Sequence, residues 1–455
     1  MFTSKRMNPR NKNITIIGVG ETGQGAAFLA KELGANVLVS DSGEINDKAF
    51  FKKAYEMGIK LETGGHTNNV YNSDLWILSP GISDKIEIIR NAKNKGIKIV
   101  SEIEFASWFT DKPIIAVTGT NGKTTTVSII NEILNKGDLS PVLAGNIGFA
   151  FSRAIFDDLA KCDENRIYVL ELSSFQLEHI STFKPFISII LNITPDHQDR
   201  YENMEAYVEA KMKIAINHDS KSYLLYNSDD SQLVNKCKNL PTNKISFGLI
   251  RNSQNILKID NSHIVDNQAK IVSIDNIALK GRHNLSNILA AASAAKILNV
   301  AHKHISETLS NFSGIEHRLE KVETISGVTY YNDSKATNVE SVIAAITSFK
   351  NPIILILGGK DKDSNFNSLS PFLNKKIKKI VSYGEARNKI SIALRDAVEL
   401  NKVFSLRDAV EECRKSAVSG DIVLLSPGCA SFDQFKNYEH RGSEFKKIVK
   451  NVAYA

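Results

Sequence analysis

Short apolar runs without polar alternation recur along the whole chain, and they limit the folds that it can adopt. Many of these runs end in Gly, Ser, Thr, Asn or Asp, and helix-like segments separate them, such as residues 25–33, 127–135 and 287–298. A strand that is apolar on both faces has to be covered on both faces, as in parallel sheets flanked by helices. The pattern therefore predicts an α/β fold whose ligands gather where strands end. The runs are residues 14–17, 114–117, 167–170, 187–191, 353–357 and 422–425.

The length of the chain and the residues that interrupt its strand–helix pattern predict three domains. At 455 residues the chain is too long for a single core, because a domain takes roughly 150 residues. The Asp111-Lys112-Pro113 stretch closes a first block, and a new series of strand–helix units begins near Ile315. We expect a Rossmann-like N-terminal domain at 1–110, a central P-loop mononucleotide-binding domain with a mostly parallel sheet at 111–314, and a Rossmann-like C-terminal domain at 315–455.

Composition and charge exclude several classes of protein. The formal net charge of +7 comes from Lys and Arg residues scattered among nearly as many acids, which suits nucleotides and forms no motif for nucleic acid. The four cysteines are far apart and form no C-x-x-C pair, which indicates a reducing compartment. The start of the chain lacks the apolar segment of a secretory signal, and no stretch approaches the roughly 18 apolar residues of a membrane span. We expect a cytoplasmic protein with no membrane span and no nucleic-acid partner.

A glycine-rich loop in the first half of the chain predicts a nucleotide site. The strand at 114–117 runs directly into Thr118-Gly119-Thr120-Asn121-Gly122-Lys123-Thr124-Thr125-Thr126 and then into a helical stretch, which is the context of a P-loop. Glycines let backbone amides turn toward phosphate oxygens, Lys123 can bridge the β and γ phosphates, and the Thr124 hydroxyl can ligate Mg²⁺. The usual pattern would place its first glycine at Val117, whereas here it stands at Gly119. The predicted ATP-binding residues are Gly119, Thr120, Asn121, Gly122, Lys123, Thr124 and Thr125.

A second glycine-rich turn, near the N-terminus, predicts a diphosphate site. Gly18-Val19-Gly20-Glu21-Thr22-Gly23 follows one strand, and Asp41 ends the next strand, about where a Rossmann fold places the acid that binds ribose. Taken alone, this arrangement indicates NAD binding. The same geometry grips any diphosphate, including that of a UDP-sugar, so both interpretations stay open at this point.

Two polar residues at strand ends of the central block are catalytic candidates, and the resemblance described below adds Lys123 and Lys211 to them. Glu171 ends the strand at 167–170, where a carboxylate beside a P-loop completes the ligand shell of Mg²⁺. His197 follows the strand at 187–191 of the same predicted sheet. Lys211 stands in a helical stretch, and the pattern alone favours a solvent-facing side chain for it. The two strand-end residues therefore predict a metal-assisted phosphate site.

These motifs together resemble the Mur ligase family, and the resemblance covers almost the whole chain. The loop at 118–124 is similar to the variant P-loop of that family, which accounts for the displaced glycine. The Asn332-Asp333-Ser334-Lys335-Ala336-Thr337-Asn338 run and the segment 431–435 are similar to the branch that adds D-glutamate. Further motifs in the family's order are Gly145-Asn146-Ile147-Gly148, residues 170–177, Asp196-His197-Gln198-Asp199-Arg200-Tyr201, Gly281-Arg282-His283-Asn284, His317-Arg318, Gly358-Gly359-Lys360-Asp361-Lys362 and residues 426–430.

The resemblance implies an ATP-dependent, amide-bond-forming ligase of peptidoglycan precursor synthesis. Such an enzyme transfers the γ-phosphoryl group of ATP to the carboxylate of UDP-N-acetylmuramoyl-L-alanine. The amine of D-glutamate attacks the acyl phosphate, and a tetrahedral intermediate collapses to amide and phosphate. By resemblance Lys123 holds the phosphates, Thr124 and Glu171 bind a first Mg²⁺, and His197 binds a second. Lys211 matches the carbamylated lysine of the family, an anion that helps to hold the second Mg²⁺ and whose formation requires a neutral amine with a depressed pKa.

The remaining binding residues are also assigned by the resemblance, and they are spread over all three expected domains. This distribution implies that the domains close around the substrates. We expect a monomer. The contacts are Glu21, Thr22 and Ser79 for the UDP-substrate, Asn146 for the substrate or intermediate, Asn284, Arg318 and Asp333 for ATP, and Lys335, Thr337, Lys362, Ser431 and Tyr438 for D-glutamate.

Several alternatives remain beside this prediction. An NAD-dependent dehydrogenase would use the glycine motif at residues 18–23 but would need neither the P-loop nor Glu171. A non-catalytic ATP-binding regulator would keep the P-loop without needing the metal set. Nearer alternatives are a Mur ligase that adds another amino acid and a folylpolyglutamate synthetase-like ligase, which the run at 332–338 disfavours.

Overall fold

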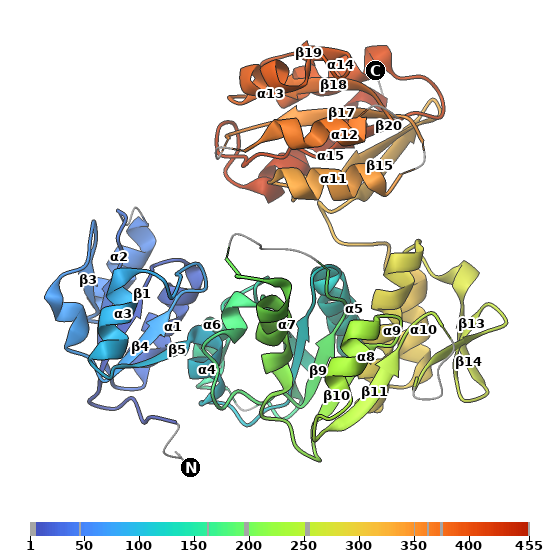
Figure 1. Ribbon diagram of the computed structural model, residues 1–455. Coiled ribbons are helices and arrows are strands. Elements are labelled where there is room, and N and C mark those ends of the chain that lie inside the picture. The colour runs from blue at the N-terminus through green and yellow to red at the C-terminus, as the bar shows by residue number, and fades with distance from the viewer. Residues whose placement is uncertain are drawn as a thin grey trace. The chain divides into compact units, whose positions relative to one another are not determined.

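The computed structural model describes residues 6–44, 47–161, 163–194, 200–250, 255–349, 351–361, 364–373 and 376–453 (Figure 1). The chain divides into two compact units, residues 1–312 and residues 313–455. The unbroken apolar runs are confirmed as buried strands, and three large sheets are built almost entirely from parallel pairs. The predicted α/β fold class is therefore confirmed.

The first sheet has the strand order β3-β2-β1-β4-β5, and all its pairs are parallel. The chain crosses from one strand to the next through helices, as parallel pairing requires. The glycine motif at residues 18–23 lies between β1 and α1, at the carboxyl edge of the central strand. The elements are β1 Asn13–Ile17, α1 Glu21–Glu32, β2 Asn36–Ser40, α2 Lys48–Glu56, β3 Lys60–Glu62, η1 Asn68–Tyr71, β4 Leu75–Leu78, α3 Glu87–Asn94, β5 Lys98–Ser101 and α4 Glu102–Ser107.

The second sheet has the order β11-β10-β9-β6-β8-β7, again with parallel pairs throughout. Strand β6, which carries the phosphate loop, lies inside the sheet between β9 and β8. A small antiparallel sheet, β12-β13-β14, belongs to the same unit. The elements are β6 Ile114–Thr118, α5 Lys123–Lys136, β7 Ser140–Gly145, α6 Phe151–Asp158, β8 Arg166–Glu171, η2 Phe175–Leu177, β9 Ile187–Ile190, α7 Met204–Met212, η3 Lys213–Ala215, β10 Tyr223–Asn227, α8 Ser231–Cys237, β11 Asn243–Phe247, β12 Lys258–Asp260, β13 His263–Asp266, β14 Ala269–Ser273, η4 Ile274–Asn276, α9 Arg282–Ile297 and α10 His302–Asn311.

The first two sheets share one apolar core. Phe28 of α1, Phe105 of α4 and Phe151 of α6 belong to the same buried cluster. Helix α1 approaches α6 closely at Gly25, where a methyl group would lie 2.7 Å from Ser152 Oγ, so that a larger side chain would push the helices apart. The predicted border at residue 110 thus separates two regions with a common core, and three separate domains within the whole chain stay a prediction.

The second unit contains a six-stranded sheet of order β15-β16-β20-β17-β18-β19. Its only antiparallel pair among the described residues is β15 with β16, an edge hairpin, and the other pairs are parallel. Two buried clusters contain inward-facing residues of this sheet, one with α11 to α13 and one with α14 and α15. The elements are β15 Glu320–Ile325, β16 Val328–Asn332, α11 Val339–Thr347, β17 Ile353–Gly358, η5 Phe366–Leu369, α12 Ser370–Leu373, β18 Ile377–Tyr383, α13 Arg387–Leu394, β19 Leu400–Lys402, α14 Leu406–Ser416, β20 Ile422–Leu425 and α15 Tyr438–Ala453.

Three predicted helices begin earlier than the apolar pattern indicates. Helices α1, α5 and α9 start at Glu21, Lys123 and Arg282, so the polar loop residues already form their first turns. A helix that opens in a ligand-binding loop has no apolar residue to mark its start. In the part of the chain that the structure describes, no helix combines the length and the apolar character needed to cross a membrane.

Candidate active site

The phosphate loop joins β6 to α5 and needs glycine at two positions. Gly119 has φ +151°, and a methyl group there would lie 3.0 Å from Leu191 Cβ. Gly122 has φ +88°, and a methyl group there would lie 2.3 Å from Asn287 Oδ1 of α9. Both positions combine a left-handed backbone with close packing, so a side chain fits neither. Asn287 is buried, and the sequence analysis did not select it.

The chain that follows β9 holds the loop in place. The backbone N–H groups of Thr120 and Asn121 donate to Asn192 O and Asn192 Oδ1, both at 2.9 Å. The Asn192 amide donates back to Asn121 O at 3.0 Å. The Thr120 hydroxyl accepts from Thr194 N at 3.0 Å. Asn192 is therefore a structural part of the loop, although its sequence position showed only that it follows a strand.

Two lysines from different helices meet at one carbonyl group of the loop. Lys123 Nζ donates to Gly119 O and to Thr120 O, both at 2.9 Å. Lys211 Nζ donates to Gly119 O at 3.0 Å and lies 4.5 Å from the centre of the Tyr207 ring. Lys211 is only 2% exposed, so the solvent-facing side chain that the pattern favoured is wrong. The arrangement concentrates positive charge at the loop, where anions can be bound.

Glu171 stands beside the loop at the end of β8, where it pairs in register with Val117 of β6. Its side chain is 3% exposed. Oε1 accepts from Asn146 Nδ2 at 2.8 Å, and the backbone N–H of Asn146 donates to Glu171 O, also at 2.8 Å. Oε2 is buried, and no described residue donates a hydrogen bond to it. A buried carboxylate oxygen of this kind requires a cation or another donor, and Mg²⁺ prefers such oxygen ligands.

The other predicted metal ligands differ in what the structure shows of them. Thr124 is buried in the first turn of α5, on the helix that the loop opens. His197 lies outside the described residues. The fit of Mg²⁺ therefore depends on Glu171 and Thr124, whose oxygen donors are of the type that this ion takes.

The glycine motif of the first sheet is packed against its own surroundings. Gly18 has φ +92°, and a methyl group there would lie 2.8 Å from Ser79 Cβ. Ser79 Oγ donates to Gly18 O at 3.1 Å, which attaches the turn after β4 to the motif. The Asp41 carboxylate accepts from Val19 N at 2.8 Å and from Gly43 N at 2.9 Å. Asp41 therefore holds the loops together with both oxygens, which weakens the NAD interpretation.

Two predicted contacts of the UDP-substrate stand at the start of α1. Glu21 is exposed, and its Oε1 accepts from Ala150 N of the neighbouring region at 3.2 Å. Thr22 is partly buried in the same turn. Both residues belong to the glycine motif and to the first turn of α1, and their contact with a substrate stays a prediction.

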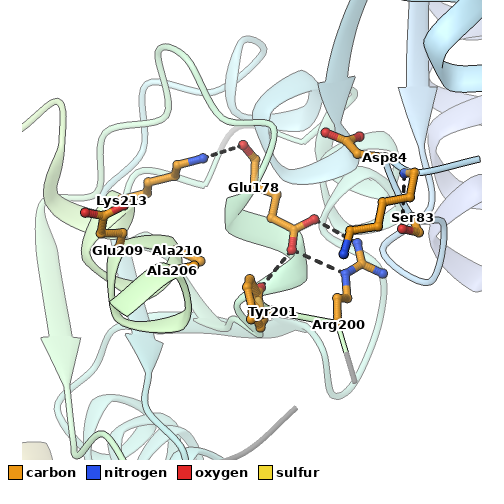
Figure 2. A pocket seen from close by; sticks show the side chains of 10 residues that line it. Ser83, Asp84, Glu178, Arg200, Tyr201, Ala206, Glu209, Ala210 and Lys213 are labelled. Atoms are coloured by element: carbon orange, nitrogen blue, oxygen red, sulfur yellow. Dashed lines mark hydrogen bonds and ion pairs between the residues drawn. The ribbon is translucent and has the colours of Figure 1, made fainter. Parts of the chain in front are cut away.

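A cavity of about 280 Å³ lies between the turn after β4 and helix α7 (Figure 2). Glu178 at its wall accepts from Arg200 Nη2 and from the Tyr201 hydroxyl, both at 2.7 Å. Arg200 Nη2 also donates to Ile82 O at 3.1 Å, so this cluster links the first and second sheets. No predicted site residue lines the cavity, whose lining residues are Ser83, Asp84, Lys85, Glu178, Arg200, Tyr201, Ala206, Glu209, Ala210 and Lys213.

In the second unit, Asp333 follows β16 and is 5% exposed. Its oxygens accept from Ser426 Oγ at 2.8 Å and from Leu319 N at 3.2 Å. Burial raises the pKa of Asp333 to about 7, although these hydrogen bonds and the charge of Arg318 act in the opposite direction. The charge of Arg318 therefore acts on Asp333, and the contact of either residue with ATP stays a prediction. Asn284 lies in the first unit, where its amide donates to Lys280 O at 2.9 Å.

The described residues of the predicted D-glutamate set follow β16 or β20 or begin α15, and their contact with the amino acid stays a prediction. Lys335 Nζ lies 5.9 Å from the centre of the Tyr438 ring, and burial raises the pKa of Tyr438 to about 12. Ser431 is buried, and its carbonyl accepts from Gln434 N at 3.2 Å. Thr337 is partly buried in the same loop as Lys335. Lys362 lies outside the described residues.

Arg441 of α15, which the sequence analysis did not select, fastens these loops to each other. It is 0% exposed. Its Nε donates to Ser334 Oγ at 2.9 Å and its Nη2 donates to Ser334 O at 2.8 Å. Its Nη1 donates to Cys429 O at 3.1 Å and to Ala430 O at 3.3 Å. An arginine in a polar helix has the sequence signature of a surface residue, so the pattern contained no signal for this role.

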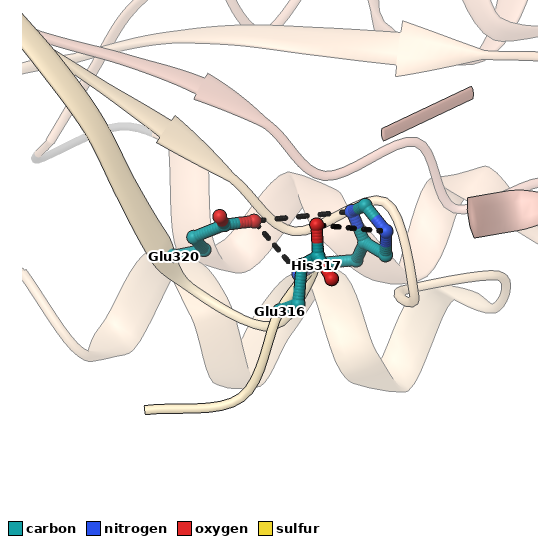
Figure 3. A group of neighbouring side chains, drawn as sticks. All are labelled: Glu316, His317 and Glu320. Atoms are coloured by element: carbon teal, nitrogen blue, oxygen red, sulfur yellow. Dashed lines mark hydrogen bonds and ion pairs between the residues drawn. The ribbon is translucent and has the colours of Figure 1, made fainter. Parts of the chain in front are cut away.

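A group of three potential metal ligands, Glu316, His317 and Glu320, lies at the start of the second unit (Figure 3). Lys446 Nζ donates to Glu316 and to Glu320 Oε1, the latter at 3.0 Å. Asn332 Nδ2 donates to Glu320 Oε2 at 2.9 Å. The ammonium group of Lys446 pairs with both carboxylates, so this cluster is an ion-pair network beside Arg318.

Comparison with known proteins places these regions in one family. Residues 12–101 match the family model described as Mur ligase MurD-like, N-terminal domain. Residues 117–295 match the Mur ligase middle domain, and residues 317–429 match the Mur ligase, glutamate ligase domain.

Relatives named UDP-N-acetylmuramoylalanine–D-glutamate ligase are similar over their full length. That of Christiangramia forsetii is 40% identical over 97% of this chain and 100% of its own, and that of Salinibacter ruber is 37% identical over 97% and 98%. Among solved structures, the UDP-N-acetylmuramate–alanine ligase of Thermotoga maritima has a TM-score of 0.59 at 19% identity, covering 97% of this chain and 100% of its own. The MurF ligase of the same organism, solved in complex with ADP, has a TM-score of 0.56 at 15% identity, covering 98% and 96%. These structures share the fold, and the matches over nearly the whole length show that the chain belongs to the Mur ligase family.

Proposed function

We propose that this protein is the ATP-dependent ligase that joins D-glutamate to UDP-N-acetylmuramoyl-L-alanine in peptidoglycan precursor synthesis. One observation carries the proposal: a phosphate loop and a buried carboxylate, one oxygen of which has no hydrogen-bond partner among the described residues, stand side by side on β6 and β8. This pair suits phosphoryl transfer from ATP. The identity of the two substrates is supported by the names of the relatives at 36–40% identity.

The chemistry explains why cations surround the loop. A carboxylate is a poor acyl donor because its leaving group would be oxide, and phosphorylation replaces that leaving group with phosphate. The γ-phosphoryl group and the carboxylate are both anions, so their approach requires positive charge between them. Lys123 and the amides at the start of α5 provide this charge on the phosphate side. The amine of D-glutamate then attacks the acyl phosphate, and the tetrahedral intermediate collapses to an amide and phosphate.

Mg²⁺ fits the residues at the loop. Glu171 Oε2 and the Thr124 hydroxyl would hold one ion, and His197 is proposed as a ligand of a second. When bound, the ions neutralise charge that develops on the phosphate oxygens. Asn146 keeps the Glu171 carboxylate in one orientation by its hydrogen bond to Oε1.

Lys211 is proposed to be carbamylated. Its ammonium group donates to the same carbonyl oxygen as that of Lys123, so the two like charges lie close together. Like charge and burial both favour a form of the lysine that has lost its positive charge, and a neutral amine is the form that reacts with CO₂. Mass spectrometry of the intact protein and the bicarbonate dependence of turnover test this step, with Lys211→Ala as the variant that cannot be carbamylated. A wild-type protein that carries no added CO₂ and responds to bicarbonate no more than Lys211→Ala contradicts it.

The second unit is proposed to bind the amino acid. Lys335 offers a cation and Ser431 and Thr337 offer hydroxyls, which are the groups that pair with the two carboxylates of D-glutamate. Arg318 and Asp333 are proposed contacts of ATP, so turnover requires both units. We also propose that the protein acts as a monomer in the cytoplasm.

Phosphate release tests the function directly. It should require ATP, UDP-N-acetylmuramoyl-L-alanine and D-glutamate together, and a panel of amino acids should show release with D-glutamate only. Release with ATP alone, or equal release with L-alanine or a diamino acid, would falsify the proposed specificity.

A further inference from the structure

The loop between β7 and α6, residues 145–150, is attached at one end to the proposed metal ligand. Asn146 contacts Glu171 with both its backbone N–H and its side chain, each at 2.8 Å. The loop is tight, because Gly145 N donates to Phe149 O at 2.9 Å and Gly148 has φ +75°. Movement at one end of so short a loop is transmitted to the other end.

The other end of the loop is attached to two carboxylates from the first-sheet region. Glu21 Oε1 accepts from Ala150 N at 3.2 Å, and Glu102 Oε1 accepts from Ser152 N. Helix α6 starts at Phe151 and has no side-chain cap of its own. The free N–H groups at the start of a helix attract anions, so the two glutamates take the place of a capping residue.

Glu102 is an unusual choice for this place. It is 2% exposed, and burial raises the pKa of Glu102 to about 7, with the charge of Glu21 acting in the same direction. Burying a carboxyl group lowers the stability of the fold unless hydrogen bonds compensate for the loss of water. The burial of Glu102 therefore indicates that its hydrogen bond to Ser152 N is important. Ser152 itself is fully buried, so water cannot replace the acceptor for its N–H.

We propose that Glu21 and Glu102 are positioning residues of the ligase: by holding the start of α6 they fix the loop that keeps Asn146 on Glu171. The inference rests on the proposed function for the role of Glu171 as a metal ligand. It gives Glu21, which the sequence analysis assigned to the UDP-substrate, a second task. It also connects the glycine motif of the first sheet, where Glu21 stands, with the metal site beside the phosphate loop.

The expected consequence is a weaker metal site when either carboxylate is removed. Without its acceptor the start of α6 gains freedom, and Asn146 holds Glu171 in one orientation for less of the time. Substitution of a residue that orients a metal ligand weakens metal affinity by about 10–100-fold. Glu21 and Glu102 act on Glu171 only through Asn146, so we expect a smaller loss of about 3–10-fold for them. Because the Glu21 side chain is exposed, we expect its replacement to leave the fold intact.

The experiment measures Mg²⁺-dependent binding of a non-hydrolysable ATP analogue by the full chain. Half-saturating Mg²⁺ is compared for Glu21→Ala, Glu21→Gln, Glu102→Ala and Glu102→Gln, each alone and combined with Asn146→Ala. The Gln variants keep an oxygen that can accept from the same N–H groups. The matched control is Glu32→Ala, which removes an exposed carboxylate from the same helix α1.

We expect the Ala variants to raise half-saturating Mg²⁺ by about 3–10-fold and the Gln variants by less than about 2-fold, with no further rise when Asn146→Ala is present. Values equal to that of Glu32→Ala, or effects that add to Asn146→Ala, would overturn the inference. If Glu102→Ala does not fold, the Glu21 series decides. The binding assay contains no D-glutamate, so it tests the positioning role separately from the proposed function. If the variants show the expected change in half-saturating Mg²⁺ but the wild type does not turn over with D-glutamate, the proposed function fails and the positioning role stands.

Discussion

Two buried carboxylates, one in each unit, lie at the carboxyl ends of strands, and they differ in the hydrogen-bond donors around them. Glu171 accepts one hydrogen bond from Asn146, and its second oxygen has no donor among the described residues. Asp333 accepts on both oxygens, from Ser426 and from Leu319. A strand-end carboxylate that lacks a protein donor is open to a cation, whereas one with a donor on each oxygen also holds chain segments together. The open group should be sensitive to loss of charge, and the other group should tolerate it.

The open carboxylate should show the largest effect. Glu171→Gln keeps the size and one oxygen but loses the charge that balances a cation. ATP-dependent phosphate release should fall by about 10³-fold, since a metal ligand contributes several kcal/mol to transition-state stabilisation. Glu164→Gln, an exposed position just before β8, is the matched control and should keep its rate. Equal rates for Glu171→Gln and Glu164→Gln would show that the charge of Glu171 is not needed, and the contrast with Asp333 would fail.

The support around Asp333 should show the next largest effect. Arg441→Met fills a similar volume but removes the guanidinium donors to Ser334, Cys429 and Ala430. The free energy of unfolding of the second unit should fall by about 2–4 kcal/mol, because buried acceptors lose their partners. Urea unfolding of the full chain measures it, with the exposed Arg407→Met as control. A loss no larger than that of the control would show that the loops are held by other contacts.

Gly122 of the phosphate loop should be less tolerant of a side chain than Gly20 of the first-sheet glycine motif. Gly122→Ala forces a left-handed residue with φ +88° against Asn287, whereas Gly20→Ala meets nothing within 4 Å. The first change should cost about 1–3 kcal/mol of unfolding free energy and weaken ATP binding, and the second about 0.5 kcal/mol or less. Thermal and urea unfolding of both variants give the values. Similar losses would mean that Gly122 and Gly20 are equally constrained.

Neutralising Asp333 should give the smallest effect on rate and a clear dependence on pH. The pKa of Asp333 is about 7 in the folded protein and about 3.8 when unperturbed. As pH rises from about 4 to about 7, the unfolded chain releases this proton before the folded chain does, so wild-type stability falls; above about 7 it is constant. Asp333→Asn lacks this fall. Because asparagine keeps a carbonyl oxygen at the proposed ATP contact, the rate of this variant should stay within about 3-fold of wild type.

Urea unfolding at pH 5 and pH 7.5 measures the sign of this effect. Relative to wild type, Asp333→Asn should be more stable at the higher pH than at the lower one. A difference in stability that does not change with pH would show that Asp333 is ionised throughout, like an exposed carboxylate.

The sequence predicted the strands and the loop residues well, because both leave local signals. An unbroken apolar run such as residues 114–117 is enough to predict a buried strand, and Gly122 before Lys123 is enough to predict a phosphate loop. Glu171 was predicted for the same reason, since its place at the end of a strand is a local property. The D-glutamate residues came from the resemblance and had no local signal.

Contacts between distant segments were beyond the reach of such patterns. Lys211 has the sequence surroundings of a surface lysine, and only the packing of α7 beside the loop buries it. Asp41 has the position of a ribose-binding acid, yet it accepts hydrogen bonds from two loop amides. Asn192 and Arg441 form hydrogen bonds with backbone groups of other segments. Because every residue has the same backbone groups, the sequence does not show where such contacts form.

The close contact of α1 with α6 at Gly25 has a practical consequence for dissecting the molecule. A fragment cut at residue 110 would expose aromatic side chains on both new surfaces, such as Phe105 on one and Phe151 on the other. Both pieces should aggregate when expressed separately. Residues 1–312 should instead be the smallest soluble fragment that contains the phosphate loop, and a library of truncations should stop yielding soluble protein once it removes the first strand.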